Sequence, residues 1–192
     1  MLSASQLNQL LTQYTLASRS VGASALTPED EAVLHSSGWP ADVPLTGWIR
    51  ADVARFILLR DLAGTVDADA FAHAAQECFA QGDAGEQRSW CRGVSLLPAP
   101  ERFLALMTDT CRTNILPLFQ AVACENPYPA RYFSELHFNQ MVLKAMFNSV
   151  ALARIVGLPE RRNAELSRMS SDYAAERTAA GRAVPPDIAL AQ

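Results

Sequence analysis

The sequence predicts an all-α protein. We expect a single domain over 1–192 with about eight helices, whose antiparallel hairpins pack as an irregular bundle or an α-solenoid-like array around a central apolar helix. Apolar residues recur at intervals of three and four along most of the chain, and no useful length of it alternates as a strand does. Gly, Pro and capping residues separate these periodic segments. With 49% hydrophobic and 19% charged residues, a chain of 192 residues can bury a sizeable core.

The first five predicted helices begin and end at recognisable signals. They cover 3–19, 28–38, 48–62, 67–81 and 83–97. Thr27 followed by Pro28 predicts the start of the second helix, because Thr can cap a helix and Pro fits its first position. Asp83 and Glu86 have the spacing of a capping box at the start of the fifth.

The remaining helices include the one on which the predicted fold is centred. A sixth helix over 101–124 should be kinked or divided at Pro117. The stretch 125–155 opens with a rigid Asn-Pro-Tyr-Pro turn and then becomes a long helix that is apolar nearly all the way round. Such a helix is normally surrounded by others, so we place it at the centre. Asn163 can cap the eighth helix, which runs to 181.

Composition argues against several classes of protein. The formal net charge of -4, without a basic run, argues against nucleic-acid binding. No apolar run reaches the ~20 residues of a membrane span, and the N-terminus lacks the pattern of a secretory signal. No two of the four cysteines form a CxxC pair, so we expect buried free thiols and a reduced, cytoplasmic location. They are Cys78, Cys91, Cys111 and Cys124. We expect neither a metal nor a cofactor.

Polar residues form a stripe along the central helix. His137, Gln140, Lys144 and Asn148 are three, four and four residues apart, so they share one face. A polar group in an apolar environment is costly unless it is paired, so the stripe must meet water, protein partners or a ligand. Three interpretations are open: an internal hydrogen-bond network, contact with a ligand or partner, and catalysis.

Neighbouring helices carry further polar residues on their apolar sides. Asn114 lies on the sixth helix, and Tyr173 and Arg177 lie on the eighth. We therefore predict a cavity between these two helices and the central one, bordered by His137, Gln140, Lys144 and Arg177. Tyr128 has two interpretations, as part of a rigid connector or as a gate over a helix N-terminus that favours an anion.

The candidate ligand- or partner-binding residues are therefore polar side chains of these three helices and the turn between them. They are Asn114, Asn126, Tyr128, His137, Gln140, Lys144, Tyr173 and Arg177. His35 and His73 belong to helices other than that of His137, so no ligand spacing for a metal is present. No residue is assigned as catalytic.

Several motifs in 82–187 resemble the EboA family. They are Glu86-Gln87-Arg88, Leu96-Leu97-Pro98, Arg112-Thr113-Asn114, Asn126 to Ala130 (NPYPA), Phe138 to Phe147 (FNQMVLKAMF) and Asp172 to Asp187 (DYAAERTAAGRAVPPD). The resemblance implies a place in an ebo gene cluster, which is linked to making or exporting a secondary metabolite. Such clusters also encode enzyme-like proteins, and the EboA member has no established reaction. The resemblance thus implies other ebo-cluster proteins or a small-molecule intermediate as partners.

Two functions follow from the stripe and the resemblance together. The first is an accessory protein that docks a cluster enzyme or holds a pathway intermediate. The alternative is an enzyme of the same pathway, in which Lys144 acts as a base or forms a Schiff base and His137 shuttles protons. A purely structural homo-oligomer is a third reading.

Overall fold

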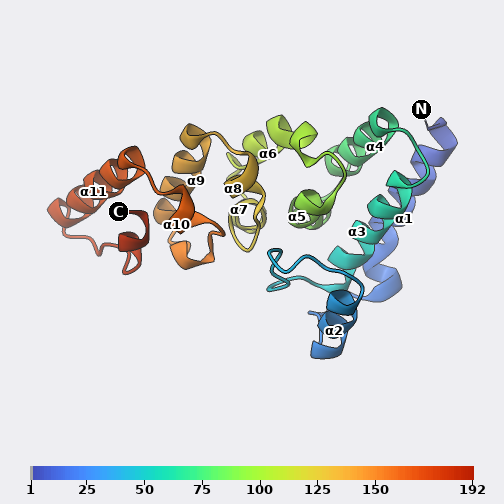
Figure 1. The fold of residues 1–192 in the computed structure, drawn as a ribbon, viewed down its shortest axis with the longest axis horizontal. Helices are drawn as coiled ribbons and strands as arrows, with labels where there is room; N and C mark the ends of the chain where they lie inside the picture. Colours follow the sequence, from blue (N-terminus) through green and yellow to red (C-terminus); the bar gives the residue numbers. More distant parts are fainter. Residues whose placement is uncertain (1) are drawn as a thin grey trace. The chain divides into compact units, whose positions relative to one another are not determined.

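The computed structural model describes residues 2–192 and confirms the all-α class (Figure 1). In this part of the chain, regular structure consists of eleven α-helices and four short 3₁₀ helices, and one isolated bridge joins Ala25 to Ile49. Contacts divide the chain into two compact units, Met1–Asp109 and Thr110–Gln192. The expectation of one domain, arranged as a bundle or solenoid-like array, stays a prediction.

The first unit holds the predicted helices one to five. Its elements are α1 (Ala4–Val21), α2 (Pro28–Ser36), α3 (Arg50–Ala63), α4 (Ala68–Ala80), α5 (Ala84–Gly93), η1 (Val94–Leu96), η2 (Pro100–Phe103) and all but the last residue of α6 (Leu104–Thr110). The side chains of Thr27 and Asp83 accept hydrogen bonds from the backbone N–H three residues on, and each completes a capping box. The predicted starts of α2 and α5 are therefore confirmed.

Helices α1, α3 and α5 pack together, and α4 covers α5. Trp90 of α5 is 1% exposed, and its ring lies 5.1 Å from that of Phe103 and 5.3 Å from that of Phe79, with edge-to-face geometry. Its indole N–H donates to the carbonyl of Ala75 at 2.8 Å, so the polar atom of this buried ring is satisfied.

The predicted sixth helix is divided. Helix α6 ends at Thr110, and α7 (Leu116–Ala123) begins after a short irregular segment. Pro117 lies in the first turn of α7, where its missing N–H leaves no helical bond unmade. The division therefore precedes the proline by several residues, because proline is tolerated at a helix start but not inside one.

The second unit contains the segment that we placed at the centre. Its elements are α7, α8 (Tyr128–Tyr132), α9 (Glu135–Phe147), η3 (Leu152–Arg154), α10 (Leu158–Arg161), α11 (Ala164–Ala179) and η4 (Ile188–Ala191). The prediction of one long helix after the turn at 126–129 is wrong. Ser134 caps a new helix by accepting a hydrogen bond from His137 N–H at 3.2 Å, and Ser149, with φ of 56°, follows its end.

Helix α9 packs against α7 and α11. Met141, Val142 and Ala145 on its buried face are 0–1% exposed. On its other face Leu136 and Phe147 are each 62% exposed. The helix is therefore buried on one side, whereas its sequence suggested burial all round. No helix within 2–192 has the length and apolar character needed to cross a membrane.

Candidate functional site

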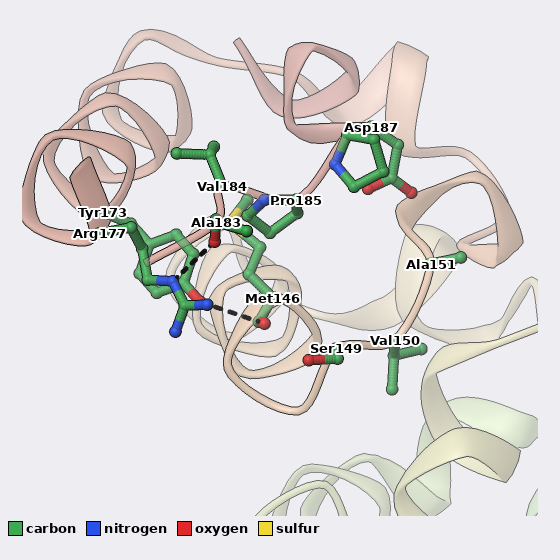
Figure 2. A pocket seen from close by; sticks show the side chains of 11 residues that line it. Met146, Ser149, Val150, Ala151, Tyr173, Arg177, Ala183, Val184, Pro185 and Asp187 are labelled. Carbon is green, nitrogen blue, oxygen red and sulfur yellow. Dashed lines mark hydrogen bonds between the residues drawn. The ribbon is translucent and has the colours of Figure 1, made fainter. Parts of the chain in front are cut away.

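A cavity of about 410 Å³ lies in the second unit (Figure 2). We name it the α9–α11 cavity. Its wall is formed by the end of α9, the turn that follows it, the last turns of α11 and the segment 183–187. The turn contributes Val150, the α9 end contributes Met146, and 183–187 contributes Val184 and Pro185. This lining is mainly apolar.

Tyr173 and Arg177 bring two of the polar groups to this cavity. They are one turn apart on α11, so their side chains leave the helix on the same face. The Arg177 guanidinium carbon lies 5.9 Å from the centroid of the Tyr173 ring. The Tyr173 hydroxyl donates to the Met146 carbonyl at 3.3 Å, which links α11 to α9.

The segment 183–187 is held at both ends. The Nε–H of Arg177 donates to the Ala183 carbonyl at 2.9 Å. At the other end, an Asp187 carboxylate oxygen accepts the backbone N–H of Leu152 at 2.6 Å, where η3 begins. Pro185 and Pro186 lie between these two attachments and restrict the backbone. The cavity wall is therefore fixed by contacts that α11 and η3 provide.

The lining is suited to binding. Among its eleven residues there is no cysteine, histidine or lysine, and its carboxylate, Asp187, already accepts a backbone hydrogen bond. Within 2–192, no three side chains of His, Cys, Asp or Glu form a group that could hold a metal ion. The lining thus offers an apolar wall with one guanidinium, one phenol, the hydroxyl of Ser149 and the carboxylate of Asp187.

Of the predicted site residues, Tyr173 and Arg177 line this cavity, whereas Lys144 has other contacts. Its ammonium donates to the carbonyls of Cys111 at 2.9 Å and Thr113 at 2.6 Å. It also lies 5.0 Å from the centroid of the Phe119 ring. Lys144 therefore ties α9 to the segment before α7.

The other members of the stripe do not line the α9–α11 cavity with Arg177. His137 is half-buried, with its ring 6.3 Å from that of Phe133, and Gln140 is exposed. Asn148 caps the end of α9 and donates to the Lys144 carbonyl at 2.9 Å. Gln140 and Asn148 are exposed, so water can satisfy their polar groups and no ligand is needed to explain them.

Asn114, in the segment before α7, is exposed. Asn126 and Tyr128, in contrast, are 1% and 0% exposed. The Asn126 amide donates to the Ala121 carbonyl at 2.9 Å and accepts the N–H of Tyr128 at 2.9 Å. This geometry supports the rigid-connector interpretation of the turn, since a gate requires a side chain with access to solvent.

The predicted cap at Asn163 is confirmed, and it has a partner that sequence reasoning missed. Its carbonyl oxygen accepts the N–H of Leu166 at 2.8 Å. The amides of Asn163 and the buried Asn139 exchange two hydrogen bonds, at 3.0 and 3.1 Å. Asn139 thereby fixes the start of α11 against α9. The residues at 149–151 and 183–187 were also missed, although the motif at 184–187 was a signal for the second group.

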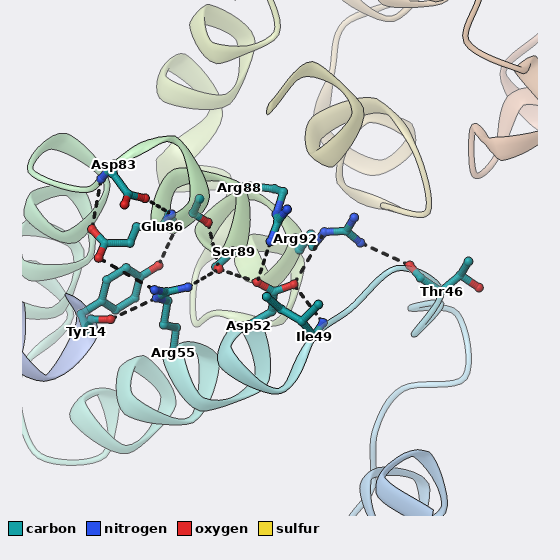
Figure 3. A network of polar contacts seen from close by, with 11 residues as sticks. Tyr14, Thr46, Ile49, Asp52, Arg55, Asp83, Glu86, Arg88, Ser89 and Arg92 are labelled. Atoms are coloured by element: carbon teal, nitrogen blue, oxygen red, sulfur yellow. Dashed lines mark hydrogen bonds and ion pairs between the residues drawn. The ribbon is translucent and has the colours of Figure 1, made fainter. Parts of the chain in front are cut away.

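A second polar cluster lies in the first unit (Figure 3). Asp52 of α3 is 0% exposed and accepts hydrogen bonds from the Ser89 hydroxyl and from the N–H of Ile49. Arg88 Nη2 and Arg92 Nε each lie 3.9 Å from one of its oxygens. The Asp52 carboxylate therefore links the first turn of α3 to α5.

Arg55 extends this cluster toward α1. Its Nε–H donates to the Tyr14 carbonyl at 3.0 Å and its Nη1 to the Ser89 hydroxyl at 2.9 Å, while Nη2 lies 3.8 Å from a Glu86 oxygen. Burial raises the pKa of the Tyr14 hydroxyl well above its usual value, so it stays protonated and donates to the Glu86 carbonyl at 3.2 Å. These bonds link α1, α3 and α5, as expected of a network that stabilises a core.

A cavity of about 340 Å³ adjoins this network, with Tyr14, Cys78 and Glu86 in its wall. Burial raises the pKa of the Cys78 thiol to about 12, so the reactive thiolate is scarce at neutral pH. Glu86 is 5% exposed and is committed to the capping box at Asp83. This cavity lacks an available reactive group, so the α9–α11 cavity is the stronger candidate site.

Comparison with known proteins gives one family. A model described as "Metabolite traffic protein EboA" matches residues 1–191, which is essentially the whole chain. No curated protein and no solved structure matched.

Proposed function

Since the chain belongs to the EboA family, described by its model as metabolite traffic proteins, we propose that it is an accessory protein that holds a small-molecule intermediate in the α9–α11 cavity. The observation that carries this proposal is the cavity's lining, which is largely apolar with a few polar groups, among them Tyr173 and Arg177 on one face of α11. Cavities of about 300–1,000 Å³ with such linings are typical small-molecule sites. At about 410 Å³, this cavity is near the small end of that range.

The proposed role is binding and delivery. A protein that delivers an intermediate needs a partner that uses it, and the resemblance to the family makes other ebo-cluster proteins the natural partners. Two of the cavity's polar groups, those of Tyr173 and Arg177, are suited to orient a ligand. A covalent reaction would need a nucleophile, a base and a group that orients the base, and the lining supplies no such set.

The alternative, an enzyme that uses Lys144 and His137, has less support. The Lys144 ammonium is engaged by two carbonyls and lies outside the lining of the α9–α11 cavity. A lysine that forms a Schiff base must instead present a neutral amine to its substrate. His137 contacts the Phe133 ring and has no place in that cavity either.

Native mass spectrometry of the full chain, purified from producing cells at native expression, tests the proposal. We expect a retained small molecule in the unaltered protein. Ala183 lines the cavity, so Ala183→Phe should displace the ligand by filling its space. Ala175→Phe is the matched control, because Ala175 is exposed on α11 and is not part of the lining.

Two results would overturn the proposed function. One is the absence of any retained molecule, together with no binding of an apolar fluorescent probe by the purified protein. The other is retention that Ala183→Phe leaves unchanged while circular dichroism shows the variant to be folded.

A further inference from the structure

Resting on the proposed function, we propose that the ligand of the α9–α11 cavity is an acid: a mainly apolar molecule with one anionic group, which Arg177 binds. The charge of the cavity is the first reason. Arg177 is the cation of the lining, and none of the carboxylates within 2–192 forms an ion pair with it. A half-buried guanidinium without an anion is left for the ligand to neutralise.

The orientation of the guanidinium is the second reason. Its Nε–H is used by the Ala183 carbonyl, and its central carbon lies 5.9 Å from the centroid of the Tyr173 ring. The two terminal nitrogens make no hydrogen bond to other residues of 2–192. Because the guanidinium is planar and its Nε–H is fixed, these nitrogens are held as a fork, the arrangement that binds carboxylate or phosphate through two parallel hydrogen bonds.

The acidic residue of the cavity does not compete for this role. Asp187 accepts the N–H of Leu152 at 2.6 Å and thereby holds the segment 183–187 against η3. Among the described residues, its carboxylate forms no ion pair with Arg177. Most of the other lining groups, such as Met146, Val150 and Val184, are apolar and suit the body of the ligand.

Two fluorescent probes with the same ring system test this assignment on the full chain. Anilinonaphthalene sulfonate carries one anionic group, and phenylnaphthylamine carries none. We expect the sulfonate to bind at least roughly tenfold more tightly, as hydrogen bonds to a charged group allow. Bulk charge does not explain such a preference, since the chain carries a formal net charge of -4.

Arg177→Gln should weaken binding of the sulfonate by roughly 10- to 100-fold and leave the affinity for the neutral probe within about twofold. Arg177→Lys should lie between, because it keeps the charge and loses the fork. Arg182→Gln is the matched control: it removes the same charge from an exposed residue close by that does not line the cavity.

A competition assay keeps the proposal testable if the Arg177 variants do not fold. Decanoate, decyl phosphate and decanamide compete with the neutral probe for the unaltered protein, and the first two should displace it at lower concentration than the amide. Their order shows whether the natural anionic group is a carboxylate or a phosphate.

The failures of the two proposals are distinguishable. If neither probe binds and the purified protein retains no small molecule, the proposed function is wrong. If both probes bind equally and the amide competes as well as the acids, the cavity binds small molecules but the assignment of an acidic ligand is overturned. Equal effects of Arg177→Gln and Arg182→Gln on the sulfonate would overturn it too.

Discussion

Replacing Asp52 by Ala should destabilise the first unit more than any surface change on the same helix. The carboxylate is 0% exposed, accepts two hydrogen bonds, and lies 3.9 Å from nitrogens of Arg88 and Arg92. Its loss leaves the Ser89 hydroxyl and the N–H of Ile49 without this acceptor and removes the anion that faces both guanidinium groups. Removing one partner of a buried ion pair costs about 3–5 kcal/mol of unfolding free energy, and we expect a loss in that range.

Asp61→Ala is the control on α3. Asp61 pairs with its neighbour Arg60 at 3.2 Å, but their side chains are 66% and 57% exposed, so this change should cost less than about 0.5 kcal/mol. All three tryptophans, Trp39, Trp48 and Trp90, belong to the first unit. Tryptophan fluorescence during urea unfolding of the full chain therefore reports on this unit.

The comparison of the Asp52→Ala and Asp61→Ala proteins can refute this reasoning. If the unfolding free energies of the Asp52→Ala and Asp61→Ala proteins agree within about 1 kcal/mol, the buried carboxylate does not stabilise α3 against α5 as argued. A double-mutant cycle with Ser89→Ala measures the hydrogen bond between these two side chains, with an expected coupling of about 0.5–3 kcal/mol.

Three further predictions concern other contacts. Burial raises the pKa of both Cys78 and Cys111 from the ordinary 9.0 to about 12, so their stabilising contribution is complete below pH 9 and is lost as pH rises toward 12. The unfolding free energy should fall by about 1.4 kcal/mol per pH unit for each thiol in that window, and the Cys78→Ala protein should show a shallower fall in a urea titration. Asn163→Ala removes a helix cap and one half of an amide pair, so the unfolding free energy should fall by about 1–3 kcal/mol. A double-mutant cycle with Asn139→Ala, with unfolding followed by circular dichroism, contradicts the pairing if the two losses of unfolding free energy simply add. Lys144→Met deprives two carbonyls of their donor and should lower the unfolding free energy by about 1–3 kcal/mol, as measured by thermal denaturation. Borohydride with carbonyl compounds should give no adduct on Lys144 of the unaltered protein, and an adduct there would support the enzyme alternative.

Predictions from the sequence succeeded where the physical cause is local. Thr27, Asp83 and Asn163 were identified as caps because a short polar side chain before a periodic segment can reach the next free N–H groups, whatever surrounds the helix. The break between α6 and α7 was anticipated from Pro117 but placed too late, because proline marks the start of α7 and not the point of division.

Predictions about polar residues succeeded only in part. Tyr173 and Arg177 line a cavity as candidate residues, yet Lys144 finds its acceptors more than thirty positions earlier in the chain. Asp52 was not predicted to be important, because a single aspartate near the start of a helix is usually exposed to solvent. In the folded chain it is wholly buried beside the guanidinium groups of α5.

The order of apolar and polar residues along this chain was enough to determine that it is helical, where most of its helices begin, and to which family it is similar, since these depend on neighbours a few positions apart. Tertiary structure alone decided that α9 is short and exposed on one side, and that residues 149–151 and 183–187 close a cavity with α11. The reason is physical: a side chain's partners across space determine whether its charge or hydrogen-bonding groups are already satisfied, and sequence spacing does not record those partners.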